Sequence, residues 1–372
     1  SVIFLKNIVN IILTFIKSIY IVPHNYFLNI NYHIIAQGTL IMDKHMTQLV
    51  VITLILLFTS FAFAQENGVS SSPSSDIPVN DIQDSNTPVA NTSDATVNNS
   101  SSSWNPFTKG NGPTSPTLAM FIAVPVITTL YGMETWDWGE QKNPQLADEG
   151  FFGKNTDSGG ADKVGHAYSH YLSFRVFHAY YDWSENGKST KWFYSISTAT
   201  FLGVFIEVGD AFTGKYGFSY EDVVADMAGI GLGILLEYSP TMDSLIGFSW
   251  QYWPTEGYTD RWGANPLHMT SDYSGAKFIL NFRLAGLQNL GLKLPNFLRY
   301  IQFDFGYFTR NYVRWDKTDD DPYRSLYFGI SLNFMEVVKD FFDNPESRTC
   351  KILQQPFKYY HIPAGYSGDY KI

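Results

Sequence analysis

The chain has 372 residues, a formal net charge of −10 and a single cysteine. A nucleic-acid-binding surface needs a basic face, so the acidic balance argues against a nucleic-acid partner. One cysteine excludes an internal disulfide and a zinc site built on several cysteines. Aromatic residues make up 17% of the chain and charged residues only 16%, a combination that favours contact with membrane lipid, where Trp and Tyr concentrate at the interface.

The first 64 residues contain a predicted export signal. Residues 42–64 open at a Met and combine a short basic start, an apolar core and the small residues "AFA" before Gln65, which is the layout of a secretory signal peptide. Residues 1–41 are rich in amino acids with AT-rich codons, so we interpret them as translated upstream DNA that is not native to the protein. The alternative is a transmembrane segment at 1–22.

Residues 65–103 consist almost entirely of Ser, Asn, Thr, Asp and Pro. A segment with so few large apolar residues cannot bury enough surface to offset its conformational entropy. We therefore expect a disordered linker, followed by an ordered helical domain at 104–240.

Four helices are expected within a unit at about 115–238. The first begins near Ser115 and Pro116, a residue favoured in the first helical turn, and is long enough to be a membrane-embedded helix or a buried core helix. The next two cover about 162–183 and 190–209. The fourth begins after Ser219, which with Asp222 resembles a capping box.

The fourth helix carries small residues at every fourth position, Ala225, Gly229 and Gly233. This spacing lets another helix approach closely, so we assign these three residues to helix packing.

From about 245 the apolar residues alternate, which is typical of strands. In "KFILNFRLAG" one face carries Phe278, Leu280, Phe282 and Leu284, and the other carries Lys277, Asn281 and Arg283. Similar segments at 245–253, 299–315 and 324–334 give about four strands, too few for a closed membrane barrel. The expected class is α+β, with a small antiparallel sheet at about 245–335 whose apolar face packs on the helices or on lipid. The β-rich segment is placed at 241–343, and an irregular tail at 344–372.

Ionisable residues gather at three predicted helix ends. Asp162, His166 and His170 are four residues apart and share a helix face, and Lys163 lies beside them. Glu207 and Asp210 end the third helix, and Asp222 and Asp226 begin the fourth. Consecutive antiparallel helices bring these ends together, so we expect one cluster. The residues are Asp162, Lys163, His166, His170, Glu207, Asp210, Ser219, Asp222 and Asp226.

Two kinds of chemistry suit this cluster. Imidazoles and carboxylates on helices ligate divalent metals, and His166, His170, Glu207 and Asp226 are the candidate ligands. A His with a carboxylate can also act as a general base, and Lys163 can contact a phosphate.

A structural interpretation stands beside the chemical one. Asp162 can be an N-cap, the histidines can be satisfied core residues, and the whole cluster can fasten three helices without binding anything. We expect Asp226 to be buried and paired with His166 and Lys163, because a buried carboxylate needs a partner.

The motifs "DKVGH" (162–166), "EVGD" (207–210) and "SYEDVVADMAG" (219–229) resemble the YfiM-like family of predicted periplasmic proteins, a domain of unknown function. They are more loosely similar to VanZ-like membrane proteins, which usually carry Gln and Asn where this chain has Asp210 and Asp226. The resemblance covers about 162–237 and implies an envelope location without an established activity. Family members are often lipoproteins, whereas this chain has no cysteine at the predicted cleavage site.

The sequence therefore predicts an exported protein of the periplasm or outer membrane of a Gram-negative bacterium, with membrane lipid as a partner. Its Asp/His/Glu cluster binds a metal, lipid head group or small ligand, or fastens the helices. The alternative function is a metal-dependent hydrolase acting on an envelope lipid or phosphate ester.

Overall fold

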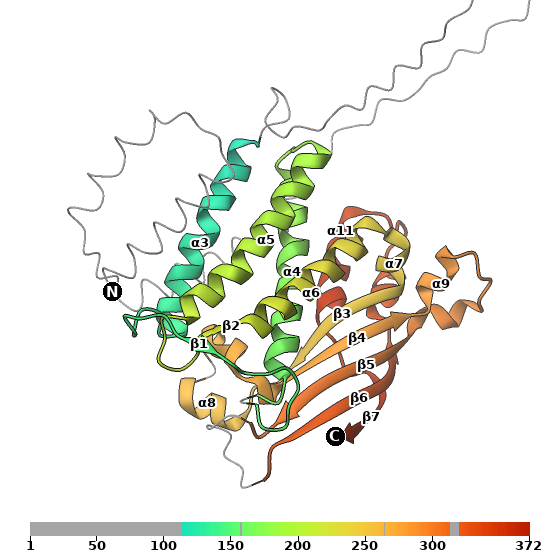
Figure 1. The fold of residues 1–372 in the computed structure, drawn as a ribbon. Helices are drawn as coiled ribbons and strands as arrows, with labels where there is room; N and C mark the ends of the chain where they lie inside the picture. Colours follow the sequence, from blue (N-terminus) through green and yellow to red (C-terminus); the bar gives the residue numbers. More distant parts are fainter. Residues whose placement is uncertain (1–112, 157, 264, 313–319) are drawn as a thin grey trace, which may run out of the picture.

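The structure is a computed structural model that describes residues 113–372, apart from 157, 264 and 313–319 (Figure 1). The predicted upstream segment, signal peptide and linker at 1–103 lie outside the described residues, so those assignments remain predictions.

Four long helices form the first part of the described chain, as expected. They are α3 (Ser115–Thr135), α4 (Ala161–Trp183), α5 (Lys188–Asp210) and α6 (Tyr220–Tyr238). Pro116 lies in the first turn of α3, and Ser219 caps α6 by accepting a hydrogen bond from the backbone N–H of Asp222. The N-cap of α4 is Gly160, so Asp162 is not a capping residue.

Helix α4 is the central helix, and α6 packs closely against it. A Cβ placed on Gly229 would lie 1.9 Å from the backbone oxygen of Ala167, and one on Gly233 would lie 2.6 Å from the Phe174 ring. The small-residue stripe of α6 therefore does pack against a helix, which requires the absence of side chains at both glycines. Buried aromatic rings, among them Phe174, Tyr181 and Tyr194, fill the space between α4 and its neighbours.

A five-stranded antiparallel sheet follows, which confirms the α+β class. Its strands are consecutive neighbours, β3 (Ile246–Tyr252), β4 (Ala276–Arg283), β5 (Ile301–Arg310), β6 (Tyr323–Leu332) and β7 (Gly365–Lys371). Figure 1 shows the long helices beside the β3 end of the sheet, with β7 at the far end.

Shorter elements connect these strands and the helices. Two short parallel strands pair with each other, β1 (Leu146–Ala147) and β2 (Phe218–Ser219). The remaining helices of the described residues are α7 (Pro240–Leu245), α8 (Glu256–Trp262), η1 (Pro266–Ser271), η2 (Tyr273–Gly275), α9 (Ala285–Asn289), η3 (Asn296–Tyr300), α10 (Phe334–Lys339) and α11 (Arg348–Tyr359).

The tail was expected to be irregular, and that prediction is wrong. Residues 344–372 form α11 and the edge strand β7. The strand β7 is hard to predict because its sequence, "GYSGDYK", has weak strand propensity. Its strand conformation depends on pairing with β6.

The sheet is rolled rather than flat. His361 lies beyond the free edge of β3, where its backbone N–H donates to Trp250 O (2.9 Å). Ala364, which directly precedes β7, lies at the opposite edge of the sheet, where its backbone oxygen accepts from the Leu332 N–H of β6 (3.0 Å). In a flat sheet these two positions would be about 24 Å apart, at about 4.8 Å per strand. Three residue steps reach at most about 11 Å, so the two edges must curve toward each other.

The two faces of the sheet alternate as predicted, but the polar face is the enclosed one. Asn281, Arg283 and Asp304 are at most 4% exposed on the inner face. Helices α4 and α6 cover the apolar outer face only near β3 and β4, where Tyr168 and Leu236 pack on Phe248 and Phe278. Rolling explains this arrangement, because it encloses the inner face and leaves the convex face to the surroundings.

Candidate functional site

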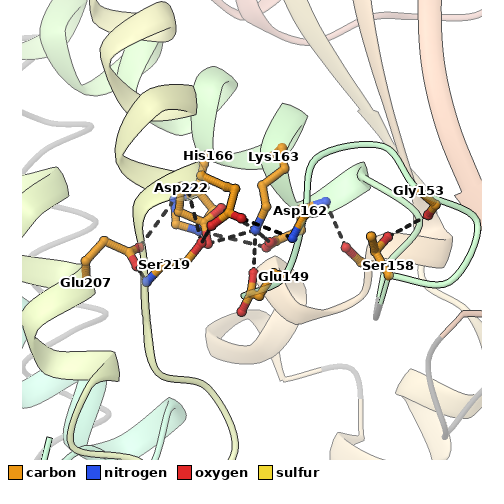
Figure 2. Close-up of polar contacts among 12 residues, drawn as sticks. Glu149, Gly153, Ser158, Asp162, Lys163, His166, Glu207, Ser219 and Asp222 are labelled. Carbon is orange, nitrogen blue, oxygen red and sulfur yellow. Dashed lines mark hydrogen bonds and ion pairs between the residues drawn. The ribbon is translucent and has the colours of Figure 1, made fainter. Parts of the chain in front are cut away.

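The polar residues of three helix ends meet beside the sheet, as the order of the elements predicts (Figure 2). We call the residues that contact one another here the helix cluster. They are Glu149, Asp162, Lys163, His166, His170, Glu207, Asp222 and Asp226.

Lys163 connects three carboxylates in the helix cluster. Its ammonium lies 2.7 Å from Asp162 Oδ2 and 2.8 Å from Asp222 Oδ1, and it also pairs with Glu149. The Lys163 side chain is only 4% exposed, so these carboxylates replace the water that a surface lysine would bind.

His166 lies between two groups of carboxylates. Its Nδ1 is 3.0 Å from Asp226 Oδ1, whereas its Nε2 is 3.8 Å from both Asp162 Oδ1 and Asp222 Oδ1. The side chain is 18% exposed, which makes it the more accessible of the two cluster histidines, since His170 is 2% exposed.

Asp226 is fully buried and pairs with both histidines. His170 Nδ1 is 2.7 Å from the same Asp226 oxygen that His166 contacts. The imidazole rings of His166 and His170 are nearly parallel, with an angle of 13° between their planes. The expected pairing of Asp226 with His166 is present, but its second partner is His170 rather than Lys163.

Glu207 and Asp210, the two acidic residues at the end of α5, have different partners. Glu207 accepts a hydrogen bond from the backbone N–H of Ser219 (3.0 Å), and its Oε1 is 3.9 Å from His166 Nδ1. Asp210 instead accepts from the indole N–H of Trp138 (2.6 Å) and makes no contact with the helix cluster that the structure records. Ser219 acts as the cap of α6 rather than as a cluster ligand.

Two further participants, Glu149 in a loop and Tyr273 in the short helix η2, were not recognised from the sequence. Glu149 reaches Lys163 because the short β1–β2 ladder holds its loop beside the start of α6. The Tyr273 hydroxyl donates to Asp162 Oδ1 (2.6 Å) from η2. Neither residue belongs to a periodic pattern, so no local signal in the sequence marks it.

The charges in the helix cluster shift the acidity of its members. Burial would raise the pKa of the Asp162 carboxyl, but the His166 and Lys163 charges outweigh burial and lower that pKa to about 2. Burial opposes the charged form of His166, yet its hydrogen bond to Asp226 and the nearby Asp222 and Asp162 raise its pKa well above the ordinary value. Burial, reinforced by repulsion from Asp162, raises the pKa of Glu149 to about 7 against the pull of Lys163.

Several buried atoms of the helix cluster have no hydrogen-bond partner among the described residues. They include His170 Nε2, Glu207 Oε1 and Asp226 Oδ2. Asp226 Oδ2 and His170 Nε2 face Gly203 of α5. A Cβ added to Gly203 would lie 2.6 Å from Asp226 Oδ2 and 3.1 Å from His170 Nε2. Buried polar atoms normally have a partner, so these atoms are suited to bind a ligand or a water molecule.

Two sets of side chains have the spacing of metal ligands, and they share His166. One set is His166, His170 and Asp226, and the other is Asp162, His166 and Asp222; within each set the ligand atoms lie within 4.8 Å of one another. Imidazole and carboxylate donors suit first-row divalent metals. Glu207, a predicted metal ligand, belongs to neither set.

The accessible side of the helix cluster is formed by Glu149, Asp162 and His166, whose side chains are 16–24% exposed. Of the two cavities described for this structure, one lies inside the rolled sheet and the other lies at the start of α5. Neither is lined by a residue of the helix cluster.

Comparison with known proteins bears on the same part of the chain. Residues 148–238 match the DUF2279 family, described as a predicted periplasmic lipoprotein. The match confirms the resemblance to YfiM-like predicted periplasmic proteins. It includes every residue of the helix cluster, ends with α6, and leaves the sheet outside.

The DUF2279 match supports an exported, periplasmic or envelope location. The single cysteine of this chain, Cys350, is buried in α11. No significant match was found among curated proteins or solved structures.

Proposed function

We propose that this protein is an envelope protein that binds one divalent metal ion through His166, His170 and Asp226. The observation that carries the proposal is the convergence of these three side chains from α4 and α6, next to buried polar atoms without partners. A metal ion would satisfy atoms that the protein alone leaves unpaired.

The charge of the helix cluster supports a cation. Asp162, Asp222 and Asp226 oppose one permanent positive charge, that of Lys163, so His166 must hold a proton to approach neutrality. A divalent ion that displaces this proton would balance the carboxylates and fix the positions of both imidazoles.

Metal analysis of the purified protein tests the proposal. We expect about one equivalent of Zn²⁺ or Mn²⁺ after loading, with affinity reduced at least about tenfold in His170→Gln and Asp226→Asn, because each loses a ligand. His178→Gln is the matched control, since His178 is a buried histidine of α4 outside the helix cluster.

The variant Asp162→Asn distinguishes the two ligand sets. Retained binding supports the proposed set, whereas loss in Asp162→Asn with retention in His170→Gln would place the ion between Asp162, His166 and Asp222. Equal metal content in all variants, together with lower thermal stability, would instead identify the cluster as a fastening network.

A metal-dependent hydrolase is the second candidate. Three protein ligands leave coordination positions for water, which is the arrangement of catalytic zinc sites. The observations on the helix cluster concern ligation by side chains, and neither cavity described above is lined by its residues, so binding is the first candidate. Metal-dependent hydrolysis of a phosphate ester, abolished by Asp226→Asn, would favour the hydrolase.

An outer-membrane location belongs to the same proposal. Density-gradient separation of cell-envelope membranes tests it, and recovery of the protein only in the soluble periplasmic fraction would contradict it.

A further inference from the structure

The helices present apolar stripes to the outside. In α6 the exposed stripe is Val224, Ala228, Gly231, Leu235 and Tyr238, at intervals of three or four residues and without a charged side chain. In α5 the exposed residues after the first turns include Ile196 and Val204, and in α3 they include Ile122 and Val126. Both α3 and α5 are long and apolar enough to cross a membrane.

The rolled sheet presents the same kind of surface on its convex face. Leu280, Phe305 and Phe328 are direct cross-strand neighbours on β4, β5 and β6, and Ile330 and Leu332 continue the row along β6. These five side chains are between 43% and 52% exposed. Together with the helix stripes they form what we call the outer surface.

Several ionisable side chains of the helices and the sheet lie in the interior. Lys163, Arg175, Glu207, Asp226 and Arg283 are each at most 6% exposed. Arg175 pairs inside the protein with Glu237 and Asp243, both at 2.8 Å. Water-soluble proteins place most charged groups on their surface, whereas proteins in lipid direct charged side chains toward their interior and pair them there.

Tyrosines mark the two ends of the α6 stripe. Tyr220 begins the helix and Tyr238 ends it, and they are 59% and 80% exposed. Eighteen residue steps at 1.5 Å place them about 27 Å apart along the axis. The hydrocarbon core of a bilayer is about 30 Å thick, and tyrosines concentrate at its two boundaries.

We propose that the outer surface contacts the acyl chains of a lipid membrane. The length of the α6 stripe between its tyrosines is one reason to choose lipid as the occupant. The other is that the apolar residues lie on three helices and on the sheet, so a single partner would have to surround the protein, while a membrane does so as a solvent. A protein interface also contains polar groups, which the stripe residues do not offer. This inference does not depend on metal binding.

Spin labels attached to single introduced cysteines test the inference in the full chain. The buried Cys350 is protected from the reagent, so Leu235→Cys and Phe328→Cys each provide one labelled position on the outer surface. Leu146→Cys is the matched control, because Leu146 is a leucine with 87% exposure in the β1 segment, outside the outer surface. The protein is reconstituted in vesicles of phosphatidylethanolamine and phosphatidylglycerol.

We expect the labels at 235 and 328 to be several-fold more accessible to oxygen, which dissolves in lipid, than to a water-soluble nickel chelate. The label at 146 should show the opposite preference. Chelate access at all three positions would overturn the inference, since it would place the outer surface in water. Protection of 235 and 328 from both reagents would also overturn it, because a protein partner or a second copy would then cover the surface.

Discussion

Two buried polar regions differ in how their central carboxylates are bonded, Asp226 in one and Asp304 in the other. The helix cluster is one, and the other, which we call the sheet network, lies inside the rolled sheet and consists of Ser249, Asn281, Gln302, Asp304, Ser331 and His361. In the sheet network, Asp304 Oδ1 accepts from Asn281 (2.8 Å) and Gln302 (3.0 Å), and Oδ2 accepts from Ser331. In the helix cluster, one oxygen of Asp226 is shared by two imidazoles and the other has no partner.

The difference teaches that burial alone does not identify a ligand site. The Asp304 carboxylate is fully hydrogen-bonded by neutral donors, which is how a polar group is accommodated in a core. The helix cluster combines excess carboxylates with unpaired atoms and partial exposure, so it has capacity for a cation. Four experiments test this contrast.

The largest expected effect is on the sheet network. Asp304→Ala removes the acceptor shared by Asn281, Gln302 and Ser331 and should lower the free energy of unfolding by about 3 kcal/mol or more. Chemical denaturation of the purified protein measures this loss. Zinc affinity should be unchanged, and a loss of less than about 1 kcal/mol would mean that the network contributes little to the fold.

A smaller loss is expected at the interface between α5 and the helix cluster. Gly203→Ala places a methyl group against Asp226 Oδ2 and should cost about 1–3 kcal/mol as well as weaken zinc binding. Gly231→Ala is the matched control, because no atom lies within 4 Å of a Cβ added there. If both variants denature at the same denaturant concentration, the close approach of α5 is unimportant.

The metal affinity should depend on pH. The raised pKa of His166 means that metal must displace its proton, so apparent zinc affinity should rise about tenfold per pH unit below that pKa. Titration calorimetry at several pH values measures the slope. Asp304→Asn should keep this slope, and a flat profile in the native protein would show that His166 is not a ligand.

The smallest effect concerns Glu149. Its pKa is raised to about 7 in the folded state, so the folded protein holds a proton that the unfolded chain releases near its ordinary value of 4.5. Stability should therefore fall as pH rises from about 4.5 to 7, by about 1 kcal/mol after allowance for partial exposure. Glu149→Gln should remove this fall in melting experiments across that range, and an unchanged slope would assign the titration to another group.

The sequence predicts the helix ends and most of the helix cluster because these depend on local patterns. The i, i+4 spacing of Asp162, His166 and His170, and the cap at Ser219, are properties of single helices. Glu149 lies in a loop and Tyr273 in the three-residue helix η2, and their positions depend on the β1–β2 ladder and on η2, which no periodicity reveals. The separation of Asp210 depends on the position of Trp138, a tertiary contact.

The sheet shows a different limit of prediction. Alternation identified the two faces of β4, but it did not indicate which face is enclosed. That choice depends on the curvature of five strands and on the tail, whose strand β7 has little intrinsic strand propensity.

The closure of the sheet by residues 361–364 has a consequence for the order of folding. Trp250 forms its bridge with Tyr360 only after 110 further residues have been added to the chain, and β7 pairs later still. Such distant contacts form slowly, because their loop entropy is lost before the contact stabilises the chain. During export the helices can associate early, while the polar interior of the sheet stays open until the last residues emerge. Chains that end before His361 should therefore accumulate as partly folded substrates of periplasmic proteases, although every helix-cluster residue is already present.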